Sequence, residues 1–196
     1  MSLTVNLKHL EHKKIVLIGA STGGPGQIQK IISSLPSLEN TSIVIAQHMV
    51  QGFIESFAAS LKNNTPNSVE IIKNNAEFKK ATIYVCEEAT HLNINSLTFT
   101  KEDGIKNSYN PDINTVFNSF SALCKKVELL VIILTGIGDD GVKATCTLSQ
   151  NGARCLTETS KSAIVDGMPS RARAVVPNVE VYDIDQIIKI VSEFCE

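Results

Sequence analysis

Three short, uninterrupted apolar segments constrain the fold more than any other feature of the sequence. They are Lys14–Gly19, Thr41–Gln47 and Glu128–Thr135. Continuous apolar runs of this length are typical of strands that are buried on both faces of a parallel sheet. Each run ends at a turn of small or polar residues, which indicates where the strand stops. These segments therefore predict the centre of an α/β sheet.

Segments with apolar residues at helical spacing alternate with these strands. In Gly52–Leu61, for example, Phe53, Phe57, Ala58 and Leu61 are expected to face inward. Alternation of strands and helices favours a doubly wound sheet with helices on both faces. The predicted helices are Gln27–Leu35, Gly52–Leu61, Asn114–Lys125, Asp140–Asn151 and Asp185–Phe194.

The remaining strands are shorter and separated by polar turns, so part of this set is expected to pair antiparallel at one edge. The predicted fold class is α/β, with a doubly wound, mainly parallel sheet flanked by helices and a small antiparallel edge. We expect a single domain over residues 14–196, preceded by a short polar N-terminal arm, residues 1–13. The shorter predicted strands are Ser68–Ile72, Thr82–Cys86, His91–Ile94, Leu97–Thr100 and Gly152–Thr157.

Composition excludes several classes of function. The chain has 18 basic and 20 acidic residues and no Trp, so we expect no nucleic-acid partner. The longest aliphatic run, Leu129–Leu134, is far too short to cross a bilayer, and no secretory signal precedes it, so no membrane insertion is expected. Five scattered cysteines without a C-x-x-C pair argue against a disulfide framework and a zinc site and fit reduced thiols in a cytoplasmic protein. We expect no metal and no cofactor.

Polar side chains follow the three apolar strands at their carboxyl ends. The turns are Gly19–Gly24, Gln47–Met49 and Gly136–Gly141. In a parallel sheet such turns lie along one edge, where open α/β sheets bind their ligands. The sequence therefore predicts that a serine, a histidine and an aspartate face one crevice.

These three residue types together suit nucleophilic catalysis. Gly19, Ser21 and Gly23 match G-x-S-x-G, a pattern whose small residues allow a sharp strand-to-helix turn that exposes the serine hydroxyl. Ser21 needs a base to take its proton, and His48 is the natural candidate. Asp140 would fix the tautomer of the imidazole and stabilise its charge.

Each of these residues also has an ordinary structural interpretation. Ser21 could cap a helix, His48 could be satisfied by the backbone, and Asp139 with Asp140 could cap the next helix. A non-catalytic or regulatory binding module on the same fold therefore stays open. A dinucleotide-binding protein is a further alternative, because Gly136–Gly141 matches G-x-G-x-x-G, although its two aspartates would repel a pyrophosphate.

Four segments together resemble the catalytic domain of chemotaxis receptor methylesterases of the CheB type. Their order and spacing match that family, and the resemblance extends over the chain from Lys14 onward. The segments are Gly19–Pro25, Ala46–Met49, Gly52–Phe53 and Ile133–Gly141.

This resemblance implies a cytoplasmic protein-glutamate methylesterase. The implied reaction is hydrolysis of glutamyl γ-methyl esters on the cytoplasmic domains of methyl-accepting chemotaxis receptors, and also deamidation of receptor glutamines. The implied catalytic residues are Ser21, His48 and Asp140. Thr22, Gln47 and Ile137 match positions that line the oxyanion and substrate site in the family, Ile137 through its backbone N–H.

The sequence also departs from the family pattern. The family carries an N-terminal receiver domain that blocks the site, and only about a dozen residues precede the first strand here, so control is expected to be missing or supplied by a partner in trans. Asn114 replaces a common aspartate, and Asp139 replaces a common asparagine. The segments Cys86–Leu92 and Glu158–Ser160 also differ from the family, in loops near the expected substrate site.

Overall fold

The computed structural model describes residues 13–50, 52–101 and 110–196. The predicted N-terminal arm, residues 1–13, lies outside the described residues except for Lys13. No helix in the described ranges is long and apolar enough to span a membrane.

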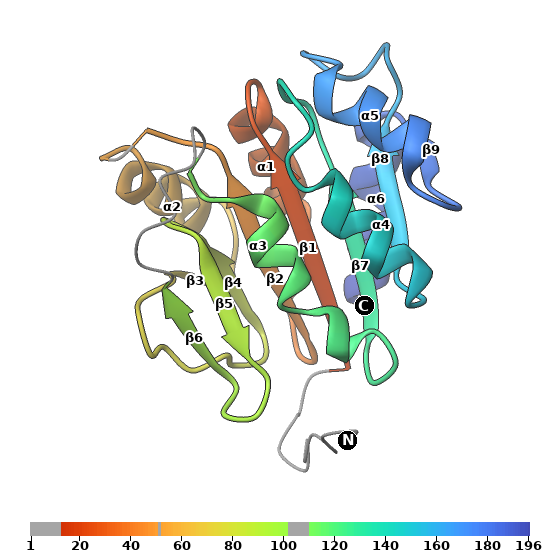
Figure 1. Cartoon of the computed structure of the whole chain (residues 1–196). Helices are drawn as coiled ribbons and strands as arrows, with labels where there is room; N and C mark the ends of the chain where they lie inside the picture. The colour runs from red at the N-terminus through yellow and green to blue at the C-terminus, as the bar shows by residue number, and fades with distance from the viewer. Residues whose placement is uncertain (1–12, 51, 102–109) are drawn as a thin grey trace, which may run out of the picture.

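A seven-stranded sheet forms the centre of the molecule (Figure 1). The strand order is β3-β4-β2-β1-β7-β8-β9, and every neighbouring pair is parallel. Because the chain proceeds from β1 to β2 on one side and later returns to β7 on the other, the sheet is doubly wound, as predicted. The strands are β1 (Lys14–Ala20), β2 (Thr41–Gln47), β3 (Ser68–Ile71), β4 (Thr82–Val85), β7 (Glu128–Ile133), β8 (Arg154–Glu158) and β9 (Glu180–Tyr182).

Helices cover both faces of the sheet, because β1, β2 and β7 are apolar on both sides. Figure 1 shows α3 and α4 in front of the sheet and α6 behind it. One core lies under α1, α2 and α6, and a second lies under α3, α4 and α5. The helices are α1 (Gly24–Ser33), α2 (Ile54–Asn63), α3 (Ile113–Asn118), α4 (Val142–Gln150), α5 (Gly167–Val175) and α6 (Ile184–Cys195).

The predicted antiparallel pairing is present, but it forms a separate two-stranded sheet and not an edge of the main sheet. Its strands are β5 (Thr90–Asn93) and β6 (Thr98–Lys101). It is anchored by an aromatic cluster in which Phe99 packs on Phe78 and Tyr84, with ring centroids 5.4 and 5.2 Å apart. Tyr84 belongs to β4, so this cluster joins the hairpin to the main sheet.

Three sequence-based expectations are corrected by the structure. The predicted helix Asn114–Lys125 ends at Asn118, and the chain continues in 3-10 geometry: the Ser119 N–H donates to the carbonyl of Val116 and the Phe120 N–H donates to that of Phe117. Phe53 does not face inward: α2 begins one residue later, and Phe53 is 63% exposed. Helix α5 and strand β9 were not predicted, because only Met168, Pro169 and Ala172 of α5 are buried and β9 has three residues.

The centre of the sheet should dominate stability. Ile18 in β1 is fully buried, so Ile18→Ala should lower the free energy of unfolding by about 2–5 kcal/mol. Val181 in the edge strand β9 is 39% exposed, so Val181→Ala should change the free energy of unfolding by less than about 0.5 kcal/mol. Urea denaturation of both variants checks this, and equal losses would contradict the assigned core.

Candidate active site

The carboxyl ends of three adjacent strands converge at one edge of the sheet. In the parallel registers, Ala20 of β1 pairs with Gln47 of β2, and Gly19 pairs with Ile133 of β7. The residues that follow these strands therefore meet beside the point where the strand order reverses, as expected for a ligand site in such a sheet. Ser21 and His48 enter this edge from β1 and β2.

Backbone hydrogen bonds fix the turn that carries Ser21. The Ser21 N–H donates to the carbonyl of Thr135 at 3.0 Å, and its carbonyl accepts from the Gln47 amide at 2.8 Å. Helix α1 has Gly23 as its N-cap, without a side-chain cap. The interpretation of Ser21 as the helix cap is therefore wrong, and its hydroxyl is left for another role.

Glycine is required at the two positions that follow Thr22, at Gly23 by its backbone conformation and at Gly24 by lack of space. Gly23 has φ of +85°, a left-handed conformation that favours glycine. A Cβ on Gly24 would lie 2.0 Å from Oε1 of Gln47 and 2.7 Å from the Cβ of Ala20. The missing side chain of Gly24, directly after the G-x-S-x-G match, thus lets Gln47 reach the Ser21 carbonyl.

His48 is bound to Asp140 by a side-chain hydrogen bond. Nε2 of His48 lies 2.8 Å from Oδ2 of Asp140, and the two side chains are 7% and 13% exposed. An ionised carboxylate only accepts hydrogen bonds, so Nε2 carries the hydrogen and Nδ1 is the basic nitrogen of the neutral ring. The interpretation of His48 as a residue satisfied by the backbone alone is wrong.

Asp140 is held by donors on both oxygens. Oδ2 accepts from the Ile113 N–H at 2.8 Å as well as from His48, and Oδ1 accepts from Gly141 and Asn114. Burial alone would raise the pKa of this carboxyl, but the bonds from His48, Ile113 and Asn114 outweigh burial and leave the pKa lowered. Asp140 is therefore ionised at neutral pH.

The same geometry argues against a dinucleotide at Gly136–Gly141. The Gly141 N–H, which would face a phosphate at the start of α4, donates to Oδ1 of Asp140 at 2.8 Å. A carboxylate already occupies the place of the phosphate. The helix N-cap is Gly141, so Asp139 and Asp140 do not cap α4 as a pair.

A hollow of about 400 Å³ opens beside Ser21 and His48. Its apolar wall includes Val50 and Phe53, which are 71% and 63% exposed. An exposed phenylalanine at the mouth of a polar site suits contact with another molecule. The lining residues are Ser21, Thr22, Gly23, Pro25, Gln47, His48, Met49, Val50 and Phe53.

The predicted site residues occupy distinct places around this hollow. Thr22 and Gln47 line it, together with Ser21 and His48, and Asp140 stands behind His48. Ile137 is 54% exposed and follows Gly136, where an added Cβ would lie 2.7 Å from the Cβ of Ser21. Gly136 therefore allows the segment with Ile137 to pass close to Ser21.

The contacts of two side chains that support the site were not predicted. Asn114 and Glu158 appeared only as departures from the family pattern, and Glu158, expected in a loop, is the last residue of β8. The Asn114 amide contacts Asp140. Glu158 is fully buried and accepts from Gln27 at 2.7 Å and from the Thr135 N–H at 2.7 Å. Burial raises the pKa of Glu158, while bonds from Ser162, Thr135 and Gln27 lower it in part. A glutamate at the end of an apolar strand was the sequence feature that could have indicated a buried polar contact at Glu158.

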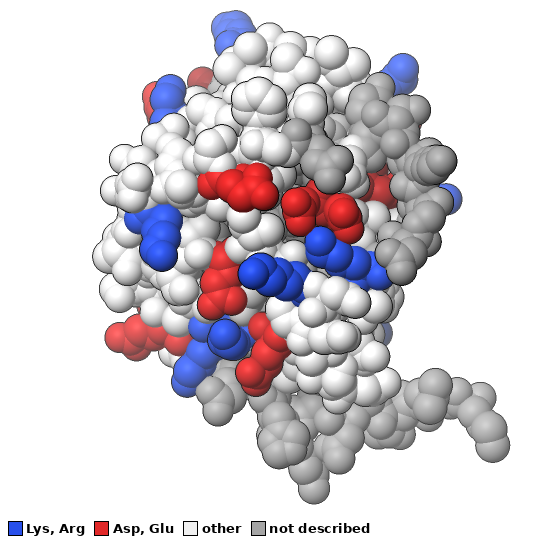
Figure 2. All heavy atoms as spheres, turned by 90° about the vertical axis from the view of Figure 1, so that its left-hand side faces the viewer, with Lys and Arg blue, Asp and Glu red and all other residues white. Residues whose placement is uncertain are grey.

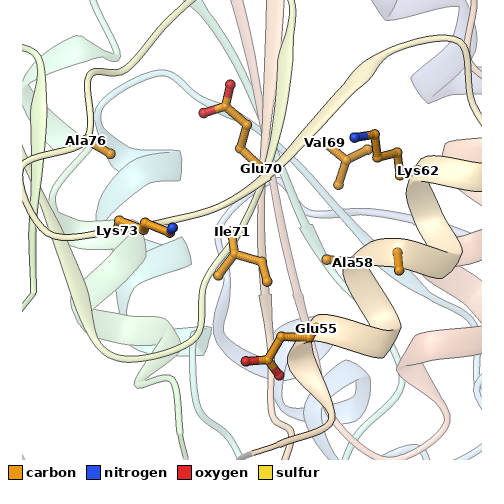
Figure 3. A pocket seen from close by; sticks show the side chains of 9 residues that line it. Glu55, Ala58, Lys62, Val69, Glu70, Ile71, Lys73 and Ala76 are labelled. Carbon is orange, nitrogen blue, oxygen red and sulfur yellow. The ribbon is translucent and has the colours of Figure 1, made fainter.

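A second hollow, of about 500 Å³, lies away from Ser21 between α2 and the edge strand β3 (Figure 3). Its rim carries both signs of charge, including Glu55, Lys62, Glu70 and Lys73. Figure 2 shows acidic and basic side chains interspersed on the left-hand face of Figure 1, without a continuous basic surface. This face therefore does not resemble a nucleic-acid interface.

Comparisons with known proteins agree on one family. The family model described as CheB methylesterase matches residues 16–191. The protein-glutamate methylesterase/protein-glutamine glutaminase of group 3 operon from Rhizobium meliloti is 35% identical over 160 residues, which cover 81% of this chain and 45% of that protein. The protein-glutamate methylesterase/protein-glutamine glutaminase of Clostridium acetobutylicum is 33% identical over 185 residues, covering 90% of this chain and 52% of that protein.

A solved structure has the same fold. The catalytic domain of the CheB methylesterase of Thermotoga maritima matches with a TM-score of 0.82 and 28% identity, covering 92% of this chain and 98% of that one. The chain spans about half the length of the curated relatives it matches.

The Ser21 turn provides a matched pair of glycine substitutions. Gly24→Ala should displace the Gln47 amide and destabilise the fold by about 1–3 kcal/mol. Gly26→Ala, two residues further along α1, meets nothing within 4 Å and should stabilise it by about 0.4–1 kcal/mol. Urea denaturation measures both, and a neutral Gly24→Ala would contradict the tight packing.

The lowered pKa of Asp140 predicts a pH-dependent contribution to stability. Because the pKa of Asp140 is lower in the folded state, folding favours the ionised carboxylate. Asp140 therefore stabilises the folded state at pH values above the ordinary pKa of an aspartate, and this contribution is lost as the pH falls through its lowered pKa. The difference in Tm between the wild type and Asp140→Asn should be largest at neutral pH and shrink toward about pH 3. A difference that stays constant across this range would contradict the assignment.

Proposed function

The chain belongs to the CheB methylesterase family, and from this premise we propose that it hydrolyses glutamyl γ-methyl esters on chemotaxis receptors. Residues 14–196 form the catalytic domain in this proposal. The observation that carries it is the hydrogen bond from His48 to Asp140 at 2.8 Å, together with the position of His48 on the wall of the hollow that Ser21 also lines. Proximity of nucleophile, base and orienting acid is the geometry of a serine esterase.

The proposed reaction begins with Ser21. Its Oγ attacks the carbonyl carbon of the ester while Nδ1 of His48 takes the hydroxyl proton. The tetrahedral intermediate then breaks the bond to the methoxy oxygen, which receives the proton from His48 and leaves as methanol. Water attacks the resulting acyl-serine with His48 again as base, which releases the glutamate carboxyl and restores the Ser21 hydroxyl.

Asp140 supports both steps through His48. Its carboxylate fixes the tautomer by accepting from Nε2, and it stabilises the imidazolium that forms when His48 is protonated. The lowered pKa of Asp140 keeps it ionised for this task. Asp140 therefore serves as the orienting acid.

The remaining predicted residues take two different roles in the proposal. The backbone N–H groups of Thr22 and Ile137 would stabilise the negative oxygen of the intermediate. The Gln47 amide is already engaged, because it donates to the carbonyls of Ser21 and His48 at 2.8 Å each. Gln47 thus positions both catalytic residues.

Deamidation of receptor glutamines is the second candidate activity. The relatives from Rhizobium meliloti and Clostridium acetobutylicum carry protein-glutamine glutaminase in their names. The same acyl-serine would form from an amide, with ammonia leaving in place of methanol. The two activities therefore share one site and stop together if Ser21 is lost.

The surroundings of Ser21 suit a protein substrate. Exposed apolar side chains stand around it: Val50 and Phe53 line the hollow, and Ile164 lies against Gly23 and is 66% exposed. A receptor helix would bury these side chains as it presents its ester. The proposed partners are therefore the cytoplasmic domains of methyl-accepting chemotaxis receptors, which places the proposed reaction in the cytoplasm.

Loss of any triad member should be severe and not additive. Ser21→Ala and His48→Ala should each reduce methanol release from methylated receptor membranes by at least about 10³-fold, and the double variant should be little worse. Asp140→Asn should fold but lose most activity because the wrong tautomer of His48 is favoured.

Ser33→Ala is the matched control, because Ser33 lies on α1 with an exposed hydroxyl bonded to the carbonyl of Lys30. It should keep wild-type activity. Near-normal methanol release by Ser21→Ala would refute the esterase mechanism. A folded wild type that binds receptors but releases no methanol would instead favour the non-catalytic binding module.

A further inference from the structure

A neutral amide stands against the carboxylate of Asp140. Nδ2 of Asn114 donates to Oδ1 of Asp140 at 2.8 Å, and the backbone N–H of Asn114 donates to the same oxygen at 3.1 Å. His48 binds the other oxygen, Oδ2. Asn114 and His48 therefore hold Asp140 through different oxygens.

The orientation of the Asn114 amide is determined by a third contact. Its Oδ1 accepts from the backbone N–H of Ala144, in the first turn of α4, at 2.9 Å. Because a backbone N–H can only donate, the oxygen of the amide must face Ala144 and the nitrogen must face Asp140. Asn114 thus connects α3 to α4 and presents a donor to the carboxylate.

This donor has an electrostatic consequence. A hydrogen bond to Oδ1 favours the ionised form of Asp140 and draws part of its negative charge away from Oδ2. A carboxylate with less charge on Oδ2 stabilises the imidazolium of His48 less.

We propose that Asn114 is a positioning residue that aims Asp140 at His48 and sets the lowest pH at which His48 acts as a base. The link to activity rests on the proposed esterase function, whereas the link to the protonation of His48 does not. Asn114 does not line the hollow at Ser21, so its effect reaches the reaction only through Asp140.

Three further ionisable groups lie close to Asn114 or Asp140 in the sequence. Asp112 precedes α3, and its carboxylate accepts from the Thr115 N–H at 2.6 Å. Asp139 and Lys143 flank Asp140 in sequence and are exposed to solvent, where their charges are screened. These groups are unchanged in the variants that test the proposal.

The test removes the donor. Asn114→Leu has a similar volume and no polar group, so Oδ1 of Asp140 loses the side-chain bond and more negative charge stays on Oδ2. This charge stabilises the imidazolium, so the NMR titration midpoint of the His48 ring should rise by about 0.5–1 pH unit. Asn114→Ala leaves room for a water donor at Oδ1 and should raise the midpoint by less.

Asn118→Leu is the matched control, because it removes the same amide at an exposed position of the same helix. Asp140 is bound by His48, Ile113, Asn114 and Gly141, so the control midpoint should stay within about 0.2 units of the wild type. For Asn114→Leu, the acid limb of kcat for methanol release should move with the His48 midpoint, and KM should change less than about twofold.

The outcomes separate this proposal from the function on which it partly rests. Unchanged His48 midpoints in both Asn114 variants would overturn it, whatever their thermal stability, because a purely structural role changes Tm alone. If the His48 midpoint rises but the acid limb of kcat does not move, the claim that Asn114 sets the lowest pH at which His48 acts as a base is overturned. If the wild type releases no methanol, the proposed function fails, and the ring titration still decides the effect of Asn114 on His48.

Discussion

The parallel pairing of β2, β1 and β7 is the constraint on which the rest of the structure depends. Parallel strands end on the same side of a sheet, so the turns after these three neighbours converge without any long connection. Strands buried on both faces have little freedom to slip in register, because a shift of one residue would misplace every side chain in the close packing against the helices. The packing of the apolar core therefore determines where Ser21 and His48 lie.

A second layer of polar contacts converts this arrangement into a site. Gln47 joins the carbonyls of Ser21 and His48, and Asp140 joins His48 to α3 and α4. Most of these bonds involve backbone groups at strand ends and in the first turns of helices, which have no other partner within their element. The site is thus held together by backbone N–H and C=O groups that are not paired within their own helix or strand.

The sequence was sufficient to predict the fold class, the central strands and the crevice at their carboxyl ends, because apolar periodicity and small-residue turns report directly on burial. It did not predict α5, whose buried residues include a proline, or the exposure of Phe53, because helical spacing alone does not show where a helix begins. The contact of Asn114 with Asp140 joins positions far apart in the chain, so local pattern could not predict it.

Covalent labelling reports directly on whether Ser21, placed beside His48 by the three parallel strands, is activated through His48 and Asp140. A serine-directed fluorophosphonate reacts only with an activated hydroxyl, and peptide mass spectrometry locates the adduct. One adduct is expected on the peptide that contains Ser21, formed by the wild type and strongly reduced in His48→Ala. Equal labelling of both proteins, or an adduct on a different serine, would contradict this activation.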